Sequence, residues 1–149
     1  MEQFKIVPVQ SVPGDCLYAA IIKGARLTCS VGDLRTSVCH VLRENHDLYD
    51  DTISELLDFG VISNRITQDE LIYRTLFKHE WGTSTTIHIL ASILRLSISV
   101  VTFINGKLFV ETFPSEFKQT LFSNRENGKI ATLYLYYTNN SHFELLEQK

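Results

Sequence analysis

The first two thirds of the chain repeat hydrophobic residues with the period of an α-helix. Leu34, Val38, Val41 and Leu42 fall on one helix face, and residues 30–33 (Ser-Val-Gly-Asp) precede them as a helix N-terminus would. This spacing predicts a helix that begins near residue 30 and buries one face.

Capping residues indicate three more helices. Asp15 precedes the apolar residues 16–22 and Gly24 follows them, which is typical of a short helix with an Asp cap and a Gly near its end. Residues 52–55 and 67–70 each place Glu three positions after Thr, the spacing of a capping box. We therefore expect helix starts near residues 16, 52 and 67.

Two opposite stripes indicate a further helix around residue 90. Its apolar stripe contains Ile87, Leu90, Ala91 and Leu94. Its polar stripe contains Thr85, His88, Ser92 and Arg95. Such a division predicts a helix laid on the core by its apolar side.

The last third changes to the two-residue period of β-strands. Residues 98–104 and 107–113 flank Asn105-Gly106, a dipeptide that supplies the positive φ angles of a type I′ turn, so we expect a hairpin. Residues 130–137 are apolar in both registers, which predicts a central strand covered on both faces.

The chain ends with one more predicted strand. Asn139, Asn140 and Ser141 have the composition of a turn, and residues 142–146 return as a strand. Helices followed by an antiparallel sheet indicate an α+β fold. No linker-like segment interrupts the chain, so we expect a single domain over residues 1–149.

Composition narrows the classes of function. With 149 residues and 44% hydrophobic residues, the chain can bury a core without disulfides or metal. A net charge of -3 excludes the basic surface of a nucleic-acid binder. The apolar residues 87–104 contain His88 and Arg95, which excludes a membrane span, and the N-terminus lacks a signal-peptide pattern. We expect a cytoplasmic monomer that binds neither nucleic acid nor membranes.

The three cysteines are Cys16, Cys29 and Cys39. Their odd number and the lack of zinc-site spacing predict free thiols in a reducing compartment, with no metal and no cofactor. Cys29 and Cys39 are interpreted as core thiols, because free cysteine is among the most buried residue types.

Cys16 has the position of a nucleophile in the first turn of its predicted helix. The N–H groups and the dipole of a helix N-terminus stabilise a thiolate. The N–H groups of Gly14, Asp15 and Cys16 are candidates to bind the oxyanion that forms when a thiolate attacks a carbonyl. The alternative interpretation is a buried structural cysteine on a core helix.

A thiolate mechanism needs a base, and His142 is the candidate. His142 and Glu144 are two residues apart on a predicted strand, so both side chains leave the same face. The carboxylate would accept Nδ1–H of His142 and set its tautomer, with Asn139 and Asn140 as alternative orienting residues. In the alternative interpretation His142 is a polar residue at a strand end. The other histidines are interpreted as residues of helix ends or of a polar helix face: His40, His46, His79 and His88.

Three ordered blocks resemble motifs of the ovarian-tumour (OTU) family of cysteine proteases. Residues 14–21 (Gly-Asp-Cys-Leu-Tyr-Ala-Ala-Ile) resemble its nucleophile motif, usually Asp-Gly-x-Cys-Leu-Phe/Tyr. Residues 81–91, which begin Trp-Gly-Thr, resemble its Trp-Gly-Gly segment before an apolar helix, and residues 96–101 match the strand after it. Residues 142–144 (His-Phe-Glu) are similar to its terminal His-aromatic-Asn/Asp.

The resemblance implies a papain-like α+β fold with a mixed or antiparallel central sheet packed between helices. It implies a deubiquitinase that cleaves the isopeptide or peptide bond after the C-terminal Gly-Gly of ubiquitin or a ubiquitin-like modifier. Cys16 would be the nucleophile, His142 the base and Glu144 the third catalytic residue. Trp81 and Gly82 would border a narrow substrate tunnel, or Trp81 would serve as a core anchor.

Two positions depart from the family pattern. Pro13 stands where members often have Asp, and Glu144 stands where they usually have Asn or Asp. These departures motivate a second hypothesis, an OTU-like ubiquitin-binding module with little or no catalysis. A third hypothesis is a papain-like protease that processes a viral polyprotein. The compact length resembles viral or bacterial members, for which we expect the host cytoplasm as location.

Overall fold

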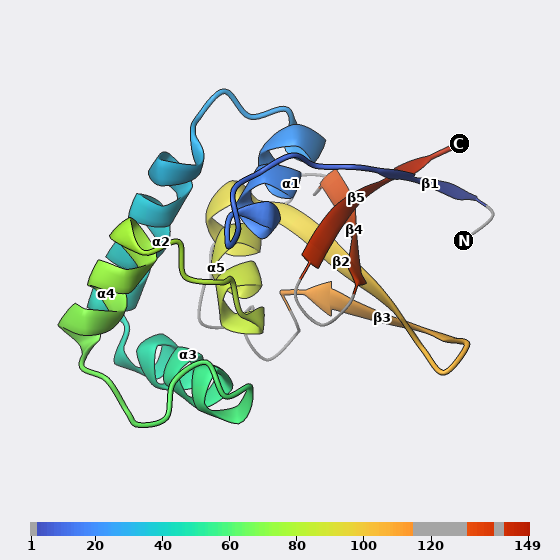
Figure 1. The fold of residues 1–149 in the computed structure, drawn as a ribbon. Helices are drawn as coiled ribbons and strands as arrows, with labels where there is room; N and C mark the ends of the chain where they lie inside the picture. The colour runs from blue at the N-terminus through green and yellow to red at the C-terminus, as the bar shows by residue number, and fades with distance from the viewer. Residues whose placement is uncertain (1–2, 115–130, 139–141) are drawn as a thin grey trace.

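The computed structural model describes residues 3–114, 131–138 and 142–149. One short strand precedes a helical region, and the remaining strands follow it (Figure 1). The elements are β1 (Phe4–Val7), α1 (Cys16–Ala25), α2 (Val31–Glu44), α3 (His46–Asp58), α4 (Gln68–Phe77), α5 (Ser84–Leu94), β2 (Leu96–Ile104), β3 (Lys107–Phe113), β4 (Ala131–Thr138) and β5 (His142–Gln148).

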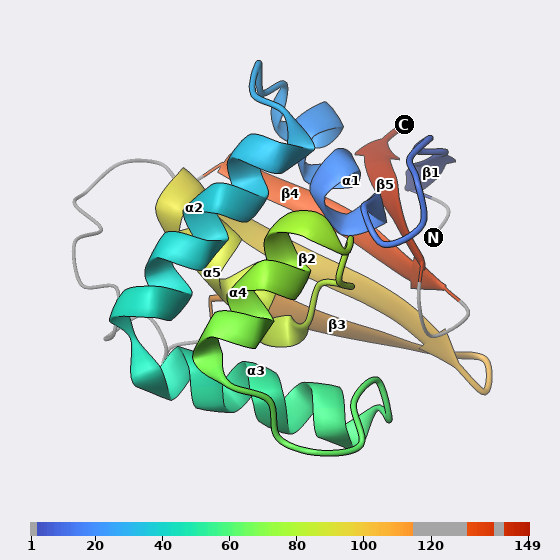
Figure 2. The same cartoon turned by 60° about the vertical axis from the view of Figure 1, so that its left-hand side comes forward.

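The strands form one mixed sheet in the order β1-β5-β4-β2-β3. The central pair β2 and β4 is parallel, and the other neighbouring strands are antiparallel. Helices α1 and α5 pack directly on the sheet, with α2, α3 and α4 further out (Figure 2). The α+β class with a mixed sheet is thus confirmed, whereas a purely antiparallel sheet is wrong at its centre.

The predicted hairpin is confirmed. Strands β2 and β3 are joined by Asn105 at φ 53° and Gly106 at φ 78°, the left-handed conformations that a two-residue turn requires. Ile104 and Lys107 are the last paired residues before the turn. Local sequence therefore determines both the turn and the register of this edge of the sheet.

Two of the predicted helix starts are confirmed by their caps. Ser30 accepts a hydrogen bond from the N–H of Asp33, whose carboxylate accepts one from the N–H of Ser30. Thr67 accepts a hydrogen bond from the N–H of Glu70 at 3.1 Å. These side chains satisfy N–H groups that the first helical turn leaves without helical acceptors.

The helix start predicted at Thr52 is wrong. Thr52 lies inside α3, which is capped by Asn45, and its hydroxyl donates to a backbone carbonyl four residues earlier. Glu55 does cap a helix, but a different one: its carboxylate accepts the N–H groups of Ser84 and Thr85 at 2.8 and 2.9 Å. The Thr-x-x-Glu spacing is therefore not a capping box here, because Glu55 makes a tertiary contact between α3 and α5 instead.

Gly24 lies near the end of α1, as predicted, but does not itself end the helix. The helix continues to Ala25, and Arg26 takes the left-handed conformation that follows it, at φ 54°. A Cβ atom on Gly24 would lie 2.3 Å from Cδ1 of Leu133 and 2.6 Å from Cδ1 of Leu145. The glycine therefore allows α1 to pack closely on β4 and β5.

Strand β4 is central, as predicted, but its two faces are not covered alike. Leu133 and Leu135 are buried on the face toward α1, whereas Tyr134 and Tyr136 on the other face are half-buried. The prediction of a strand covered on both faces is wrong in that respect. The predicted turn at residues 139–141 lies outside the described residues.

From Thr85 to Ala91, helix α5 is buried on all sides rather than along one stripe. His88, assigned by sequence to a polar face, is 6% exposed, and its ring meets that of Phe113 at a centroid distance of 4.6 Å. Thr85 on the same side is also buried. Because α2 and α3 also pack against α5, both of its sides are covered. No helix in the described ranges is long and apolar enough to cross a membrane.

Candidate active site

Cys16 is the first residue of α1, as the sequence predicted. Asp15 stands at the N-cap position with helical backbone angles, and its side chain makes no capping hydrogen bond. Cys16 is 3% exposed, so the sulfur lies at the base of the site rather than on the surface. A thiolate there would lie at the positive end of the helix dipole.

Helix α1, which Cys16 begins, packs against β4 and β5. Burial raises the pKa of the Tyr137 phenol near the end of β4, and the charge of a Cys16 thiolate would raise it further. Tyr137 pairs with Phe143 across the β4–β5 ladder, and the next pair is Thr138 with His142. The beginning of α1 and the beginning of β5 lie side by side in both views (Figures 1 and 2).

His142 and Glu144 contact each other at the start of β5, as their spacing predicted. Nε2 of His142 hydrogen-bonds Oε1 of Glu144. The expected partner atom was Nδ1, and the longer Glu side chain reaches the farther ring nitrogen instead. When Nε2–H donates to the carboxylate, Nδ1 is the basic nitrogen. Oε2 of Glu144 is buried without a hydrogen-bond partner in the described ranges, and Asn139 and Asn140 lie outside them.

The loop before Cys16, residues 12–15, needs glycine at position 14. Gly14 has φ 92°, and a Cβ atom there would lie 2.0 Å from the carbonyl oxygen of His79. Gly14 therefore allows a close approach of the protein's own backbone. The N–H of Asp15 donates to the carbonyl of Val12 at 3.1 Å, so the expectation that it binds an oxyanion is not met in this conformation.

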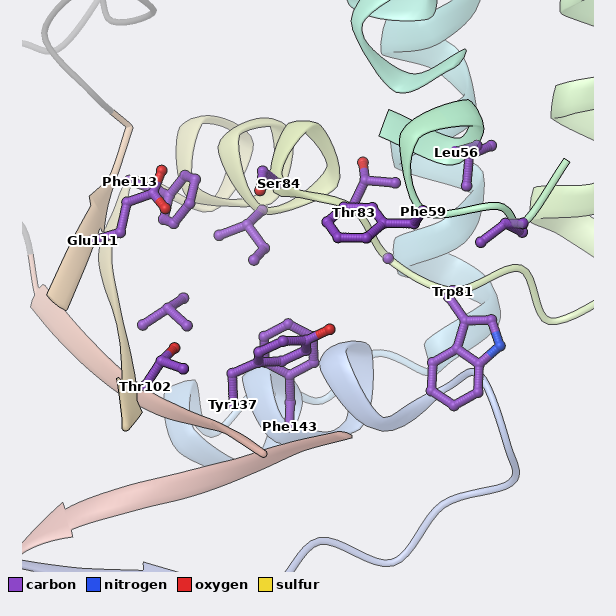
Figure 3. A pocket seen from close by; sticks show the side chains of 14 residues that line it. Leu56, Phe59, Trp81, Thr83, Ser84, Thr102, Glu111, Phe113, Tyr137 and Phe143 are labelled. Carbon is purple, nitrogen blue, oxygen red and sulfur yellow. The ribbon is translucent and has the colours of Figure 1, made fainter. Parts of the chain in front are cut away.

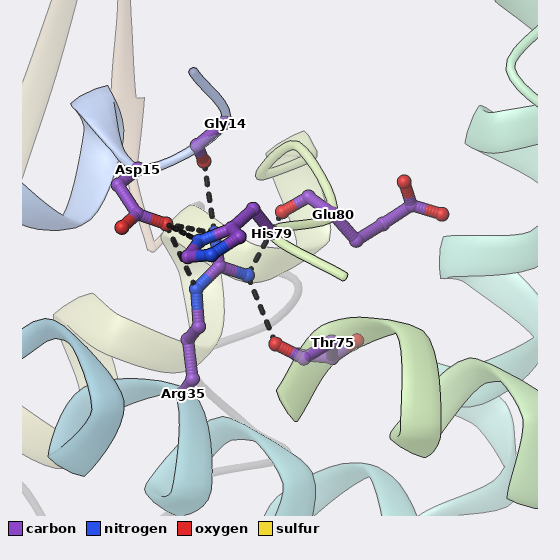
Figure 4. A network of polar contacts seen from close by, with 6 residues as sticks. All are labelled: Gly14, Asp15, Arg35, Thr75, His79 and Glu80. Atoms are coloured by element: carbon purple, nitrogen blue, oxygen red, sulfur yellow. Dashed lines mark hydrogen bonds and ion pairs between the residues drawn. The ribbon is translucent and has the colours of Figure 1, made fainter. Parts of the chain in front are cut away.

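A buried arginine that the sequence analysis did not single out lies behind this loop. Arg35 of α2 is 2% exposed, and its guanidinium contacts Asp15 and the carbonyls of Gly14, Thr75 and Glu80 (Figure 4). Its position three residues before Val38 on the apolar face of α2 was the available signal, because a charge at such a position needs buried partners.

His79 also contacts this loop, although its sequence suggested only a helix end. Its Nδ1 lies 3.0 Å from Oδ1 of Asp15, the oxygen that Arg35 contacts. The His79 side chain is 58% exposed, so this pair lies at the surface end of the polar network. The network therefore runs from α2 to the loop that precedes Cys16.

The structure has a pocket of about 780 Å³, and neither Cys16 nor His142 is among the described residues that line it. Trp81 lies at one end of the pocket, away from the paired rings of Tyr137 and Phe143 (Figure 3). Gly82 also lines the pocket, and a Cβ atom there would lie 2.3 Å from Cδ2 of Leu17. Trp81 is 40% exposed, so it borders the pocket and is not a core anchor. Glu111 is the one charged residue among those that line the pocket, in the part of the chain that is described.

The remaining cysteines have structural surroundings. Burial raises the pKa of the Cys39 thiol to about 11, and its sulfur lies 3.8 Å from the carbonyl oxygen of Ile72. Cys39 is thus a core thiol, as predicted, while Cys29 is half-buried beside the core. No group of three or more potential metal ligands occurs among residues 3–114, 131–138 and 142–149.

Comparison with known proteins identifies the family. The profile of the OTU-like cysteine proteases matches residues 12–143. The chain belongs to this family. No curated protein sequence matches the chain.

Solved structures of OTU proteins share the fold of this OTU domain. An OTU deubiquitinase from Wolbachia pipientis, bound to ubiquitin, superposes with a TM-score of 0.73 at 14% identity, covering 99% of this chain and 98% of that one. An OTU domain in complex with ubiquitin gives 0.67 at 23% identity, over 96% and 69% of the two chains. The Hazara virus OTU bound to ubiquitin gives 0.61 at 17% identity, over 99% and 83%.

Proposed function

We propose that this OTU-family protein is a deubiquitinase in which Cys16 is the nucleophile and His142 the base. The observation that carries the proposal is the position of Cys16 at the start of α1, beside the strand ends where β5 begins with His142. Three similar structures of OTU proteins hold ubiquitin, which supports ubiquitin as the substrate.

In the first step, the Cys16 sulfur attacks the carbonyl carbon of the last glycine of ubiquitin. His142 takes the thiol proton and returns it to the leaving lysine amine as the C–N bond breaks, which leaves a thioester on Cys16. Glu144 accepts Nε2–H of His142 and stabilises the imidazolium. The transferred proton would therefore be held at Nδ1.

In the second step, water attacks the thioester carbonyl. His142 removes a proton from this water and returns it to the Cys16 sulfur as the C–S bond breaks, which releases the thiol and the C-terminal carboxyl group of ubiquitin. The oxyanion of each step would lie at the first turn of α1, where the N–H of Cys16 and that of Gly14 are the candidate donors. The N–H of Asp15 would contribute only if it left Val12.

Trp81 and Gly82 are the candidate substrate-binding residues. They line a largely apolar pocket together with Tyr137 and Phe143, and Gly82 packs on Leu17, the residue after Cys16. A Gly-Gly terminus has no side chains, so a narrow passage beside these residues would admit it and exclude bulkier sequences.

A ubiquitin probe with a C-terminal electrophile tests the proposal. We expect the wild-type chain to form a covalent adduct, detected as a mass increase of one ubiquitin, and Cys16→Ala to form none. Cys29→Ala is the matched control and should label like the wild type. An adduct that persists in Cys16→Ala would contradict the assignment of the nucleophile, and no wild-type adduct would contradict the proposed function.

The second candidate function is a ubiquitin-binding module with little catalysis. Pro13 and Glu144, which depart from the family pattern, favour it. It predicts that ubiquitin binds the wild-type chain in a titration without labelling by the probe. None of the three cysteines forms a disulfide, which fits a reducing compartment, so we also propose a cytoplasmic location, that of the host if the source is viral or bacterial.

A further inference from the structure

All N–H groups of the Arg35 guanidinium donate hydrogen bonds inside the protein. Nε and Nη2 donate to Oδ1 of Asp15 at 3.2 and 2.6 Å, and Nη2 also donates to the carbonyl of Gly14 at 2.9 Å. Nη1 donates to the carbonyls of Thr75 and Glu80 at 3.0 and 2.9 Å. A guanidinium has five N–H donors, and these five contacts engage all of them.

The guanidinium also stacks on an aromatic ring of α1. Its central carbon lies 4.3 Å from the ring centroid of Tyr18, which is two residues after Cys16 and 1% exposed. The hydrogen bonds direct the plane of the group and the ring limits its tilt. Arg35 is therefore held more firmly than a typical surface arginine.

Three of the five contacts hold the two residues before Cys16. Arg35 holds the carbonyl of Gly14, and Val12 holds the N–H of Asp15 at the other end of the same peptide group. A peptide group that is bonded at both ends cannot rotate, so the direction in which the chain enters α1 is determined. That direction sets where the sulfur and the N–H of Cys16 point.

The contact with Asp15 has a second consequence. A carboxylate immediately before a nucleophilic cysteine opposes the negative charge of a thiolate. The Arg35 guanidinium lies 2.6 Å from that carboxylate and compensates its charge. The side chain of Asp15 is engaged in this ion pair and makes no capping hydrogen bond to α1, so it does not compete for the first N–H groups of the helix.

We propose that Arg35 is a positioning residue for the thiol chemistry: it holds the Gly14–Asp15 peptide and so orients Cys16 and its oxyanion donors. This inference rests on the proposed function. The alternative is a purely structural ion pair that joins α2 to the loop and to the end of α4. The two differ in what they predict for catalysis by a variant that remains folded.

Arg35→Lys separates these roles, since Lys keeps the buried charge but has no planar fork to hold Gly14 and Asp15 together. The assay is cleavage of a fluorogenic ubiquitin amide, well below the unfolding midpoint of each variant. We expect kcat to fall by about 10- to 100-fold, as small misplacements of reacting groups do, and KM to change by less than about threefold.

Val38→Ala is the matched control. Val38 lies one turn further along α2 and is 1% exposed, so its truncation destabilises the same helix without touching the loop. It should lower the unfolding midpoint and leave kcat within about twofold of the wild type. Unchanged kcat in Arg35→Lys, or a rise in KM alone, would overturn the proposal. Equal losses of kcat in both variants would also do so.

Two additions keep the outcome decisive. If Arg35→Lys does not fold, the double variant Arg35→Gln/Asp15→Asn replaces it, because it leaves neither member of the ion pair as an unpaired buried charge. This variant should show the same loss of kcat. A wild-type kcat in the double variant would refute the inference. The rate of Cys16 alkylation by iodoacetamide, followed on its peptide, needs no ubiquitin. It should fall by about threefold or more in Arg35→Lys if Arg35 orients the thiolate, even if the wild type does not cleave ubiquitin. An unchanged alkylation rate would contradict the inference independently of the proposed function.

Discussion

The two halves of the candidate catalytic pair are held very differently. The nucleophile side is buried and fastened from several directions: Gly14 packs on the backbone of His79, and Asp15 is bound by both Arg35 and His79. The base side consists of His142 at the first position of a strand, where its side chain is 41% exposed and, among the described residues, has a polar contact with Glu144 alone. Within the described residues, the nucleophile side thus has many more contacts than the base side.

This difference predicts different costs of mutation. A residue held by many contacts in a dense interior cannot relax when one of these contacts is altered. A displacement of such a residue therefore also displaces the reacting atom. A side chain at an exposed strand end can adjust its rotamer. We therefore expect substitutions on the Cys16 side to cost more activity than equivalent substitutions on the His142 side.

Gly14→Ala is the most severe test of this comparison. The new Cβ atom would lie 2.0 Å from a backbone oxygen at a left-handed φ of 92°, so the loop or the segment at His79 must move. We expect the free energy of unfolding to fall by about 2–4 kcal/mol. We expect kcat/KM for a ubiquitin amide to fall by about 100-fold. Denaturant titration and steady-state kinetics measure the two effects.

Gly106→Ala provides the control for left-handed strain alone. Gly106 has φ 78° in the hairpin turn, and a Cβ atom there would meet nothing within 4 Å. Its cost should be about 1–2 kcal/mol of stability, with activity unchanged. If Gly14→Ala behaves in the same way, the nucleophile loop is not rigid and the contrast between the two sides is lost.

Local sequence predicted the elements whose determinants are local. The Asn105-Gly106 turn and the cap at Ser30 each depend on residues within a few positions, and both are confirmed. The capping box at Thr52 was wrong because Glu55 caps α5 instead. The packing of Gly24 on Leu133 could not be predicted because the two residues come from distant segments. The roles of these residues depend on tertiary packing, which a local sequence pattern does not contain.

Glu144→Gln tests the base side. Gln keeps an oxygen that can accept Nε2–H of His142 but loses the charge that stabilises an imidazolium. General base catalysis is worth about 100- to 10,000-fold, and we expect this partial loss to lower kcat by about tenfold. The matched control is Glu147→Gln on the same strand, an exposed carboxylate 3.7 Å from Lys5.

The outcome for Glu144 distinguishes two orienting groups. If Glu144→Gln retains wild-type kcat, an Asn of the preceding turn, Asn139 or Asn140, is the better candidate to orient His142. If Glu144→Gln lost as much activity as Gly14→Ala, the base side would be as sensitive to substitution as the nucleophile side.

The candidate site was predictable where it follows a motif and not where it depends on the fold. Cys16, His142 and Glu144 could be named because each lies in a short block with a chemical reason for its spacing. Arg35 could not, because it reaches Asp15 across 20 positions and carries no local signature besides its place on an apolar face. Its five hydrogen bonds become visible only when α2, α4 and the loop are assembled.

We expect Trp81→Ala to have the smallest effect of these substitutions, because Trp81 belongs to neither catalytic side. Trp81 is 40% exposed at one end of the pocket, so its removal leaves both catalytic sides in place and removes only contact area for the substrate. We expect KM to rise by about threefold with kcat unchanged, the signature of uniform binding. Phe77→Ala, an aromatic residue that is 65% exposed and does not line the pocket, should change neither value. A loss of kcat in Trp81→Ala would mean that the segment at residues 81–82 orients Cys16 through Leu17, which would add a further constraint to the nucleophile side.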